Sequence, residues 1–318
     1  MRLKRGICVP LFDLHCDTLT ECLCKGKDLY SNDLHWDISR ALSFAPCVQV
    51  LSIWTPDTLR GAAATDRARR AIALANEAEN RFAPRFRLWH TGEEFPAVGT
   101  EECVGILGLE SAAPLAGDLA LLEEFADNGV KVITLTWNGD NEAASGVDGD
   151  EHRGLTAFGK SLLRGMERRN VAPDVSHLNE RGFWEVCDTT AAPCIASHSV
   201  SRAVFDHRRN LSDTQFSEIV RRGGLVGLNL CAAQLGEPSF ARFERHFSHF
   251  LDLGGERTLA LGFDLDGTDL PAEWNGVAVA DTLFAYLLER GYEKDLLLRV
   301  FFENAADFFK KMAKNGRF

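Results

Sequence analysis

Short apolar runs alternate along the chain with longer segments in which apolar residues recur every three or four positions. Runs of this length predict buried strands, and the periodic segments predict amphipathic helices. The strand-like runs cover residues 7–14, 48–54, 103–109, 130–136, 171–175, 193–197, 225–230 and 258–263. The helical segments include residues 66–81, 158–169, 213–222 and 301–313. The stretch Ser212-Asp213-Thr214-Gln215 is typical of a helix N-terminus.

Eight strands with interleaved helices predict an α/β fold, the (β/α)8 TIM barrel. An open doubly wound sheet is the alternative, because it shows the same alternation of elements. The chain has 318 residues, within the range of one barrel, and no Pro/Gly/Ser-rich linker interrupts it. We therefore expect a single domain over residues 1–318.

Composition narrows the class of protein. Hydrophobic residues make up 45% and charged residues 25% of the chain, as in a soluble globular protein. The formal net charge of -11 argues against nucleic acid and anionic membranes as partners. No apolar run reaches the length of a membrane span, and the run after residue 6 is too short for a secretory signal. The nine cysteines form no C-x-x-C pair, so we expect reduced thiols in a cytoplasmic protein.

Polar side chains stand where several of the strand-like runs end. In a barrel, the carboxyl ends of the strands share the face on which catalytic groups gather. Five of the eight ends carry a metal-binding or acid–base side chain, which chance explains poorly. These side chains are His15, Asp17, Glu110, His177, His198 and Asp264.

The types and spacing of these residues suggest a two-metal site. His15 and Asp17 lie two residues apart, so they face the same side of an extended segment. On its own, this pair is equally explained by a turn with a capping aspartate. A carboxylate such as Glu110 can bridge two cations, whereas a neutral imidazole binds only one. We therefore expect one metal on His15, Asp17 and Glu110 and a second on Glu110, His177 and His198, with a bridging hydroxide as nucleophile.

Asp264 follows the last apolar run and suits a general acid–base. It would take the proton of the water and return it to a leaving amine. Asp266 lies on the same extended face and is expected to orient the loop. A calcium loop is a weaker interpretation, because Asp-x-Asp-Gly alone lacks the other ligands of an EF-hand.

Together these residues resemble the membrane dipeptidase family, renal dipeptidase-like zinc peptidases within the metal-dependent amidohydrolase barrels. The resemblance extends over most of the chain, in order and in approximate spacing. It rests on Asp13-x-His15-x-Asp17, Gly108-Leu109-Glu110, Asp174-Val175-Ser176-His177, Ser197-His198-Ser199, Arg208-Arg209-Asn210 and Gly262-Phe263-Asp264-Leu265-Asp266-Gly267.

The resemblance implies a fold, a site and a substrate. It implies a barrel of the metal-dependent hydrolase type that binds two divalent metal ions, expected to be zinc, and small dipeptides as substrates. It also implies a homodimer. Arg209 would receive the C-terminal carboxylate of the dipeptide, a role that suits the bidentate guanidinium. The implied zinc ligands are His15, Asp17, Glu110, His177 and His198, with Asp264 as the catalytic acid.

The chain departs from the family pattern near the substrate. Mammalian members have a histidine where this chain has Trp137, and Trp cannot act as an acid. Its indole N–H can donate to the tetrahedral oxygen, or the ring can form an apolar wall. No tyrosine follows Asn229, where some relatives place one. The secretory signal, lipid-anchor tail and disulfides of mammalian members are also expected to be missing.

Two further patterns receive a structural interpretation. Residues 154–161 fit G-x-x-x-x-G-K-[ST], but the residues before them are polar and acidic, whereas a P-loop follows an apolar strand. We interpret this stretch as the start of the helix over 158–169. His246 and His249 lie among phenylalanines at helical spacing, and we interpret them as core or surface residues rather than a metal pair.

The sequence therefore predicts a zinc-dependent dipeptidase. An alternative is a related amidohydrolase that acts on N-acyl amino acids or lactams. A second alternative, raised by Trp137, is a non-catalytic metal-binding homologue.

Overall fold

The structure is a computed structural model that describes residues 9–315, with side chains through residue 313. Its strands are β1 (Leu11–Cys16), β2 (Cys47–Trp54), β3 (Phe86–Leu88), β4 (Cys103–Glu110), β5 (Val130–Thr134), β6 (Ala172–Asp174), β7 (Ile195–Ala196), β8 (Leu225–Leu228) and β9 (Leu259–Leu261). Its α-helices are α1 (Thr18–Lys25), α2 (Ile38–Ala41), α3 (Gly61–Phe82), α4 (Leu119–Asp127), α5 (Ala157–Arg169), α6 (Glu180–Thr189), α7 (Asp213–Arg222), α8 (Ala232–Leu235), α9 (Phe240–Asp252), α10 (Val279–Glu289), α11 (Lys294–Leu298) and α12 (Asn304–Asn315). Four 3₁₀ turns, η1 (Ala113–Leu115), η2 (Gly255–Arg257), η3 (Ala272–Trp274) and η4 (Gly276–Ala278), and one π-helical segment, η5 (Arg299–Glu303), complete the described elements.

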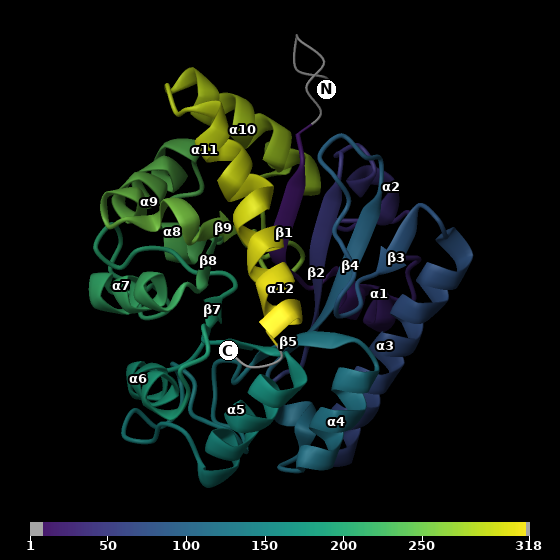
Figure 1. The fold of residues 1–318 in the computed structure, drawn as a ribbon, viewed down its shortest axis with the longest axis vertical. Coiled ribbons are helices and arrows are strands. Elements are labelled where there is room, and N and C mark those ends of the chain that lie inside the picture. Colours follow the sequence, from purple (N-terminus) through teal and green to yellow (C-terminus); the bar gives the residue numbers. More distant parts are fainter. Residues whose placement is uncertain (1–8, 316–318) are drawn as a thin grey trace.

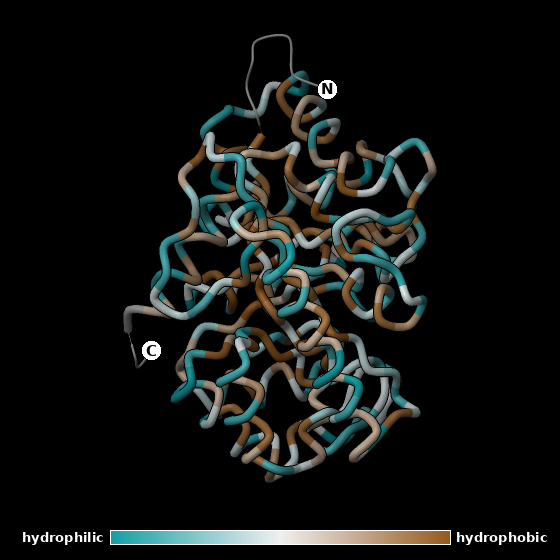
Figure 2. The backbone as a smooth tube through the Cα atoms, turned by 90° about the vertical axis from the view of Figure 1, so that its right-hand side faces the viewer, coloured by the Kyte–Doolittle hydropathy of each residue, from teal (hydrophilic) through white to brown (hydrophobic). Residues whose placement is uncertain are grey.

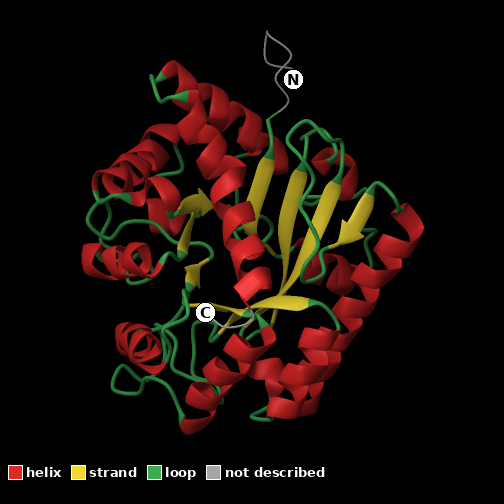
Figure 3. Ribbon diagram, in the orientation of Figure 1, coloured by secondary structure: helices red, strands yellow, loops and turns green. Residues whose placement is uncertain are grey.

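Eight of the strands close into a parallel barrel. The sheet runs β2-β1-β9-β8-β7-β6-β5-β4-β3, and a further pairing between β2 and β4 closes the ring. The short strand β3 lies outside the ring and pairs with the start of β4. Helices surround the strands, as Figure 3 shows in red around yellow. The predicted TIM barrel is confirmed, and the open doubly wound alternative is excluded.

Alternating strand residues divide the apolar core into two layers. One set of side chains, such as Phe12, Val48 and Val104, packs inside the barrel together with residues of α12. The alternate set, such as Leu11, Leu51 and Leu107, packs outward against the surrounding helices. Figure 1 shows α12, in yellow, crossing the strands, and Figure 2 shows hydrophobic segments gathered towards the middle of the molecule. With apolar side chains and α12 filling the amino-terminal half of the barrel, its polar residues are left for the carboxyl ends of the strands.

The predicted elements match the observed ones with small differences at their ends. All eight predicted strands are present, although those that become β5, β6, β7, β8 and β9 are shorter than their apolar runs. Strand β3 was not predicted, because three residues at the edge of a ring make too short a pattern to recognise. Helix α7 begins after Ser212, as predicted, and Ser212 and Gln215 form a capping box there. The start of the first predicted strand at residue 7 and the expectation about a secretory signal concern residues outside those described.

Two remaining expectations concern helices and thiols. None of the helices within residues 9–315 has both the length and the apolar character of a membrane span. The stretch that resembles a P-loop forms the beginning of α5, whose first turn is capped by Thr156. The cysteines of the described residues, among them Cys47 and Cys103, all carry free thiols.

Candidate metal centre

The six polar residues predicted at strand ends come together at the carboxyl-terminal face of the barrel. His15 lies within β1, and Glu110 is the last residue of β4. The others follow their strands within three residues, and Asp17 stands immediately before α1. None of the six is more than 9% exposed, so all of them face a site that is largely shielded from water.

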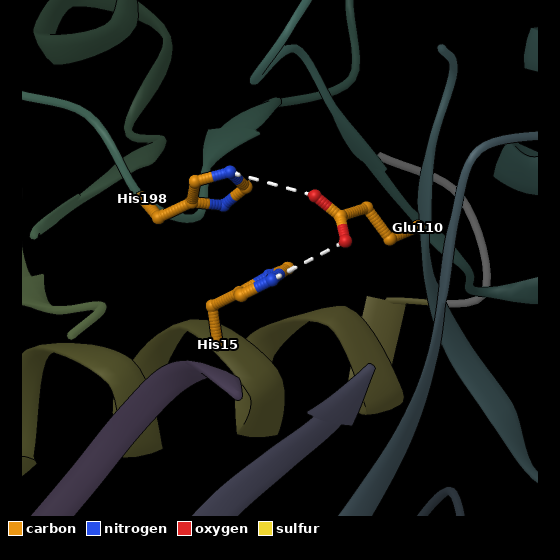
Figure 4. A group of neighbouring side chains, drawn as sticks. All are labelled: His15, Glu110 and His198. Carbon is orange, nitrogen blue, oxygen red and sulfur yellow. Dashed lines mark ion pairs between the residues drawn. The ribbon is translucent and has the colours of Figure 1, made fainter. Parts of the chain in front are cut away.

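Glu110 lies between the histidines and presents one oxygen to each side. Its Oε2 is 3.6 Å from His15 Nε2, while its Oε1 is 3.0 Å from His177 Nε2 and 3.7 Å from His198 Nε2. Figure 4 shows the carboxylate pointing towards His15 and His198 from the opposite side of the site. His15 Nε2 also lies 3.5 Å from Asp17 Oδ2. The carboxylate thus has His15 and Asp17 on one side and His177 and His198 on the other, although donor atoms of His15, Glu110 and His198 also lie within 4.8 Å of one another.

Each histidine is held by its Nδ1 atom, which leaves Nε2 facing the centre. The partner is an oxygen of a neighbouring side chain in every case. Holding the outer nitrogen in this way is the usual means of orienting a metal-binding imidazole. The pairs are His15 with Ser52 at 3.1 Å, His177 with Asn138 at 2.8 Å and His198 with Ser197 at 2.8 Å.

The donor atoms fit divalent cations. His15 Nε2 and Asp17 Oδ1 are buried polar atoms without a hydrogen-bond partner. The Nε2 atoms of His177 and His198 are only 2.8 Å apart, although both imidazoles already use Nδ1 for a hydrogen bond. Two ring nitrogens in that position repel each other unless a proton or a cation lies between them. Imidazole nitrogen and carboxylate oxygen are a ligand set that zinc and related ions accept.

The protonation of the cluster reflects its burial and crowded charges. Burial alone would raise the pKa of Glu110, but the charge of His15 holds it well below its usual range. Burial lowers the pKa of His177 to about 4 and that of His198 well below its usual range. Burial, together with the charge of Glu110, raises the pKa of Asp17 well above its usual range. Burial lowers the pKa of His15, but Glu110 and Asp17 outweigh it and raise this pKa well above its usual range. The site thus holds neutral imidazoles at His177 and His198 and a charged one at His15, beside the carboxylates.

Asp264 stands at the edge of this cluster. Its Oδ1 atom is 3.8 Å from His15 Nε2, and burial raises the pKa of its carboxyl group to about 7. Asp264 and His177 both have positive φ angles, 64° and 69°, a conformation that is uncommon for non-glycine residues. Asp266 behaves as a loop residue, since its carboxylate accepts hydrogen bonds from Thr18 Oγ1 and the backbone N–H of His35.

A cavity of about 360 Å³ opens onto these residues. Arg209 lines it while remaining only 9% exposed, and its Nη2 donates to His198 Nε2 over 2.9 Å. Cys231 and Gln234 line the sector after Asn229, where some relatives have a tyrosine. The cavity therefore has a cationic side at Arg209 and an acidic side at Asp17 and Asp264.

Two tryptophans form another wall of the cavity. The rings of Trp54 and Trp137 meet edge to face, with centroids 5.3 Å apart, and the Trp137 ring is 6.3 Å from that of His177. Arg67 holds Trp54 by donating from Nε to its carbonyl oxygen and by placing its guanidinium 5.5 Å from the ring centroid. Trp137 thus lies where the sequence placed it, beside the candidate metal ligands.

Sequence reasoning gave no role to the groups that hold the histidines. Ser52 and Asn138 carry no motif of their own, and only the tertiary structure brings them to the imidazoles. His246 and His249 lie away from the centre, as expected. His246 is fully buried and hydrogen-bonded, and His249 pairs with Asp213 at 2.8 Å.

Comparison with known proteins gives the geometry a context. A family model described as "Membrane dipeptidase (Peptidase family M19)" matches residues 7–317. A Klebsiella pneumoniae protein called "Uncharacterized protein in pqqA 5'region" is 30% identical over 247 residues, which cover 73% of this chain and 91% of that protein. Mouse "Dipeptidase 3" is 27% identical over 223 residues, covering 67% of this chain but only 45% of the mouse protein. The chain thus spans less than half the length of that mammalian relative.

A solved structure is similar over nearly the whole chain. It is a metallo peptidase from Rhodobacter sphaeroides, liganded with a phosphinate mimic of the dipeptide L-Ala-D-Ala. The TM-score is 0.84 at 26% sequence identity, and the match covers 96% of this chain and 99% of the other.

Proposed function

The chain belongs to the membrane dipeptidase family of metallopeptidases, and on this premise we propose that it hydrolyses the peptide bond of dipeptides at a dinuclear zinc centre. The observation that carries the proposal is the position of Glu110, whose two oxygens face separate histidines. The dipeptide mimic in the related Rhodobacter sphaeroides structure supports dipeptides as the substrate class.

We assign the ligands by the two sides of Glu110. His15 and Asp17 would hold one ion and His177 and His198 the other, with Glu110 between them. When bound, two such ions supply an activated water and polarise the carbonyl group of the substrate. The protein contributes the neutral Nε2 atoms and a site that is almost closed to bulk water.

Asp264 is proposed as the proton carrier. It lies beside the His15 and Asp17 side of the cluster, within reach of a water placed there. It would take one proton from that water and return it to the nitrogen of the leaving residue, as a general acid–base does. The positive φ of Asp264 supports this role, because strained backbone is kept where function requires it.

Arg209 and Trp137 are proposed as substrate-binding residues. The buried guanidinium of Arg209 would pair with the C-terminal carboxylate of the dipeptide, a bidentate partner that suits its geometry. Trp137 and Trp54 would form an aromatic wall against a substrate side chain. Between these two interpretations of Trp137, the edge-to-face contact favours a wall over a hydrogen-bond donor.

Substituting Glu110→Gln tests the proposed centre. An amide cannot replace a carboxylate that bridges two cations, so the variant should lose bound metal and dipeptidase activity together. Glu151→Gln is the matched control, because the Glu151 side chain is 85% exposed. Metal content is measured by elemental analysis of the purified proteins, and hydrolysis is followed with a panel of dipeptides. Activity that survives in Glu110→Gln with its metal content intact would show that the centre is assigned wrongly.

The same panel separates the alternatives. A related amidohydrolase would prefer N-acyl amino acids or lactams to free dipeptides. A non-catalytic homologue would bind metal and hydrolyse nothing in the panel. Loss of activity in Arg209→Lys would support its proposed role in binding a free C-terminal carboxylate, which dipeptides and N-acyl amino acids share.

Some features of the proposal concern the whole protein. We propose that the chain acts as one catalytic domain in a reducing compartment, the cytoplasm. The free thiols of its described cysteines support that location. The homodimer implied by the family resemblance stays a prediction.

A further inference from the structure

Asp174 is a buried carboxylate that the proposed reaction does not use. It is the last residue of β6 and is fully shielded from solvent. Its Oδ1 accepts the backbone N–H groups of Ser176 and Ser197, each over 3.0 Å. Its Oδ2 accepts the hydroxyl groups of Thr134 at 2.7 Å and Ser197 at 2.6 Å. Four donors thus surround the carboxylate, and both of its oxygens act as acceptors.

These bonds fix the direction of the Ser197 hydroxyl. A serine hydroxyl has one proton, and here that proton points to Asp174. The opposite direction would leave Ser197 Oγ and Asp174 Oδ2 in contact at 2.6 Å with no proton between them. Ser197 Oγ therefore acts as an acceptor towards His198 Nδ1, which is 2.8 Å away.

The direction of this bond sets the tautomer of His198. With Nδ1 as the donor, a neutral imidazole has its lone pair on Nε2, the atom that faces Glu110. A second contact gives the same result independently, because Arg209 Nη2 donates to His198 Nε2 over 2.9 Å. An arginine has donors only, so Nε2 must accept.

We propose that Asp174 is a positioning residue that acts through Ser197 to hold His198 in the tautomer that binds metal. The inference rests on the proposed metal centre, and it adds a role for two residues that are not ligands. Outer partners of metal-binding histidines typically change metal affinity by about 10- to 100-fold. These hydrogen bonds fix the tautomer of His198 in the metal-free protein.

Asp174→Asn is the decisive variant. It nearly preserves the shape of the side chain, but it replaces one acceptor oxygen with a donor NH₂ group. The amide oxygen can keep the two backbone N–H groups, while the amide NH₂ then faces Ser197 Oγ. Ser197 must turn its proton towards His198 Nδ1, which moves the imidazole proton to Nε2 and breaks the contact with Arg209 Nη2. We expect the metal affinity of the purified full-length protein, measured with zinc against a chelator, to fall by about 10- to 100-fold.

Histidine nitrogen NMR spectra of the metal-free protein provide a readout that a loss of packing would not mimic. In the wild type, His198 should carry its proton on Nδ1, and in Asp174→Asn on Nε2. The spectra report on the hydrogen bonds from Asp174 through Ser197 to His198 even if the protein does not hydrolyse dipeptides. Failure of this inference and failure of the proposed function are therefore distinguishable.

A double-mutant cycle tests whether Asp174 acts through Ser197. Ser197→Ala removes the link, so adding Asp174→Asn to it should lower zinc affinity no further. Thr134→Val is the control, because it removes a donor to the same Asp174 oxygen and leaves Ser197 in place. That control should keep the tautomer and the affinity of the wild type.

Three results would overturn the proposal. The first is an unchanged His198 tautomer in Asp174→Asn. The second is a double variant in which the fold-losses of zinc affinity caused by Asp174→Asn and by Ser197→Ala multiply. The third is a loss of affinity in Thr134→Val as large as that in Asp174→Asn.

Discussion

His246 connects the loop that carries Arg209 to the outer helices, and its protonation should destabilise the protein in acid. It is fully buried on α9. Its Nδ1 accepts the backbone N–H of Ser201 over 3.1 Å, and its Nε2 donates to the carbonyl oxygen of Leu235 over 3.2 Å. A protonated ring would set an Nδ1–H against the Ser201 N–H, so the folded protein requires neutral His246.

The expected size of the effect follows from the pKa of His246. Burial lowers this pKa from 6.5 to about 4, and the charges of Arg242, Arg245 and His249 act in the same direction. Because the folded-state pKa is the lower one, the unfolded chain takes up a proton first as the pH falls. The stabilisation is complete above about pH 6.5 and is lost towards pH 4. At about 1.36 kcal/mol per pH unit, the full loss is about 3 kcal/mol, of which about 2 kcal/mol falls between pH 7 and pH 5.

The assay compares wild type with His246→Gln. Glutamine does not titrate, so the variant lacks this component of the pH dependence although it starts from lower stability. Unfolding by urea, followed at pH 7 and pH 5, gives the free energy of unfolding of each protein. We expect the wild type to lose about 2 kcal/mol more than the variant over this interval.

His152→Gln is the control, because the His152 side chain is 86% exposed. This variant should follow the wild type at both pH values. If His246→Gln loses as much stability between pH 7 and pH 5 as the wild type does, a buried neutral His246 does not contribute to acid lability, and the reasoning is refuted.

Other substitutions test the site and its support. Asp264→Asn should lower kcat by about 10²- to 10⁴-fold while metal content, measured by elemental analysis, stays at the wild-type level; undiminished turnover would contradict its role. Trp137→Phe should keep the KM for dipeptides close to the wild-type value, whereas Trp137→Ala should raise it by about 2- to 10-fold through loss of the aromatic contact with Trp54. Equal effects of the two Trp137 variants on steady-state kinetics would favour the indole N–H instead. Gly262→Ala should destabilise the fold by about 3 kcal/mol or more in urea unfolding, because its Cβ would lie 1.8 Å from the Ser197 carbonyl oxygen; wild-type stability would exclude this clash.

The barrel was predictable because its signals are local. Each strand is an apolar run, and several of the helices are periodic segments, so periodicity alone indicated their order. The candidate ligands were predictable for a related reason. In a parallel barrel all strands end on one face, so a polar residue at a strand end is placed without knowledge of its neighbours. His177 and His198 show this, since each follows a short strand and the two strands are adjacent in the ring.

The sequence alone determined which residues gather at the carboxyl-terminal face, since their position depends only on where each strand ends. The tertiary structure decided how those residues are held. Ser52 meets His15 across the β1–β2 pairing, whose register shifts between Asp13 and Cys16, and no local pattern records such a shift. Asp174 reaches Ser197 only because β6 and β7 are neighbours. The direction of a hydrogen bond between strands depends on distances of a few tenths of an ångström, which are set by packing across the whole barrel.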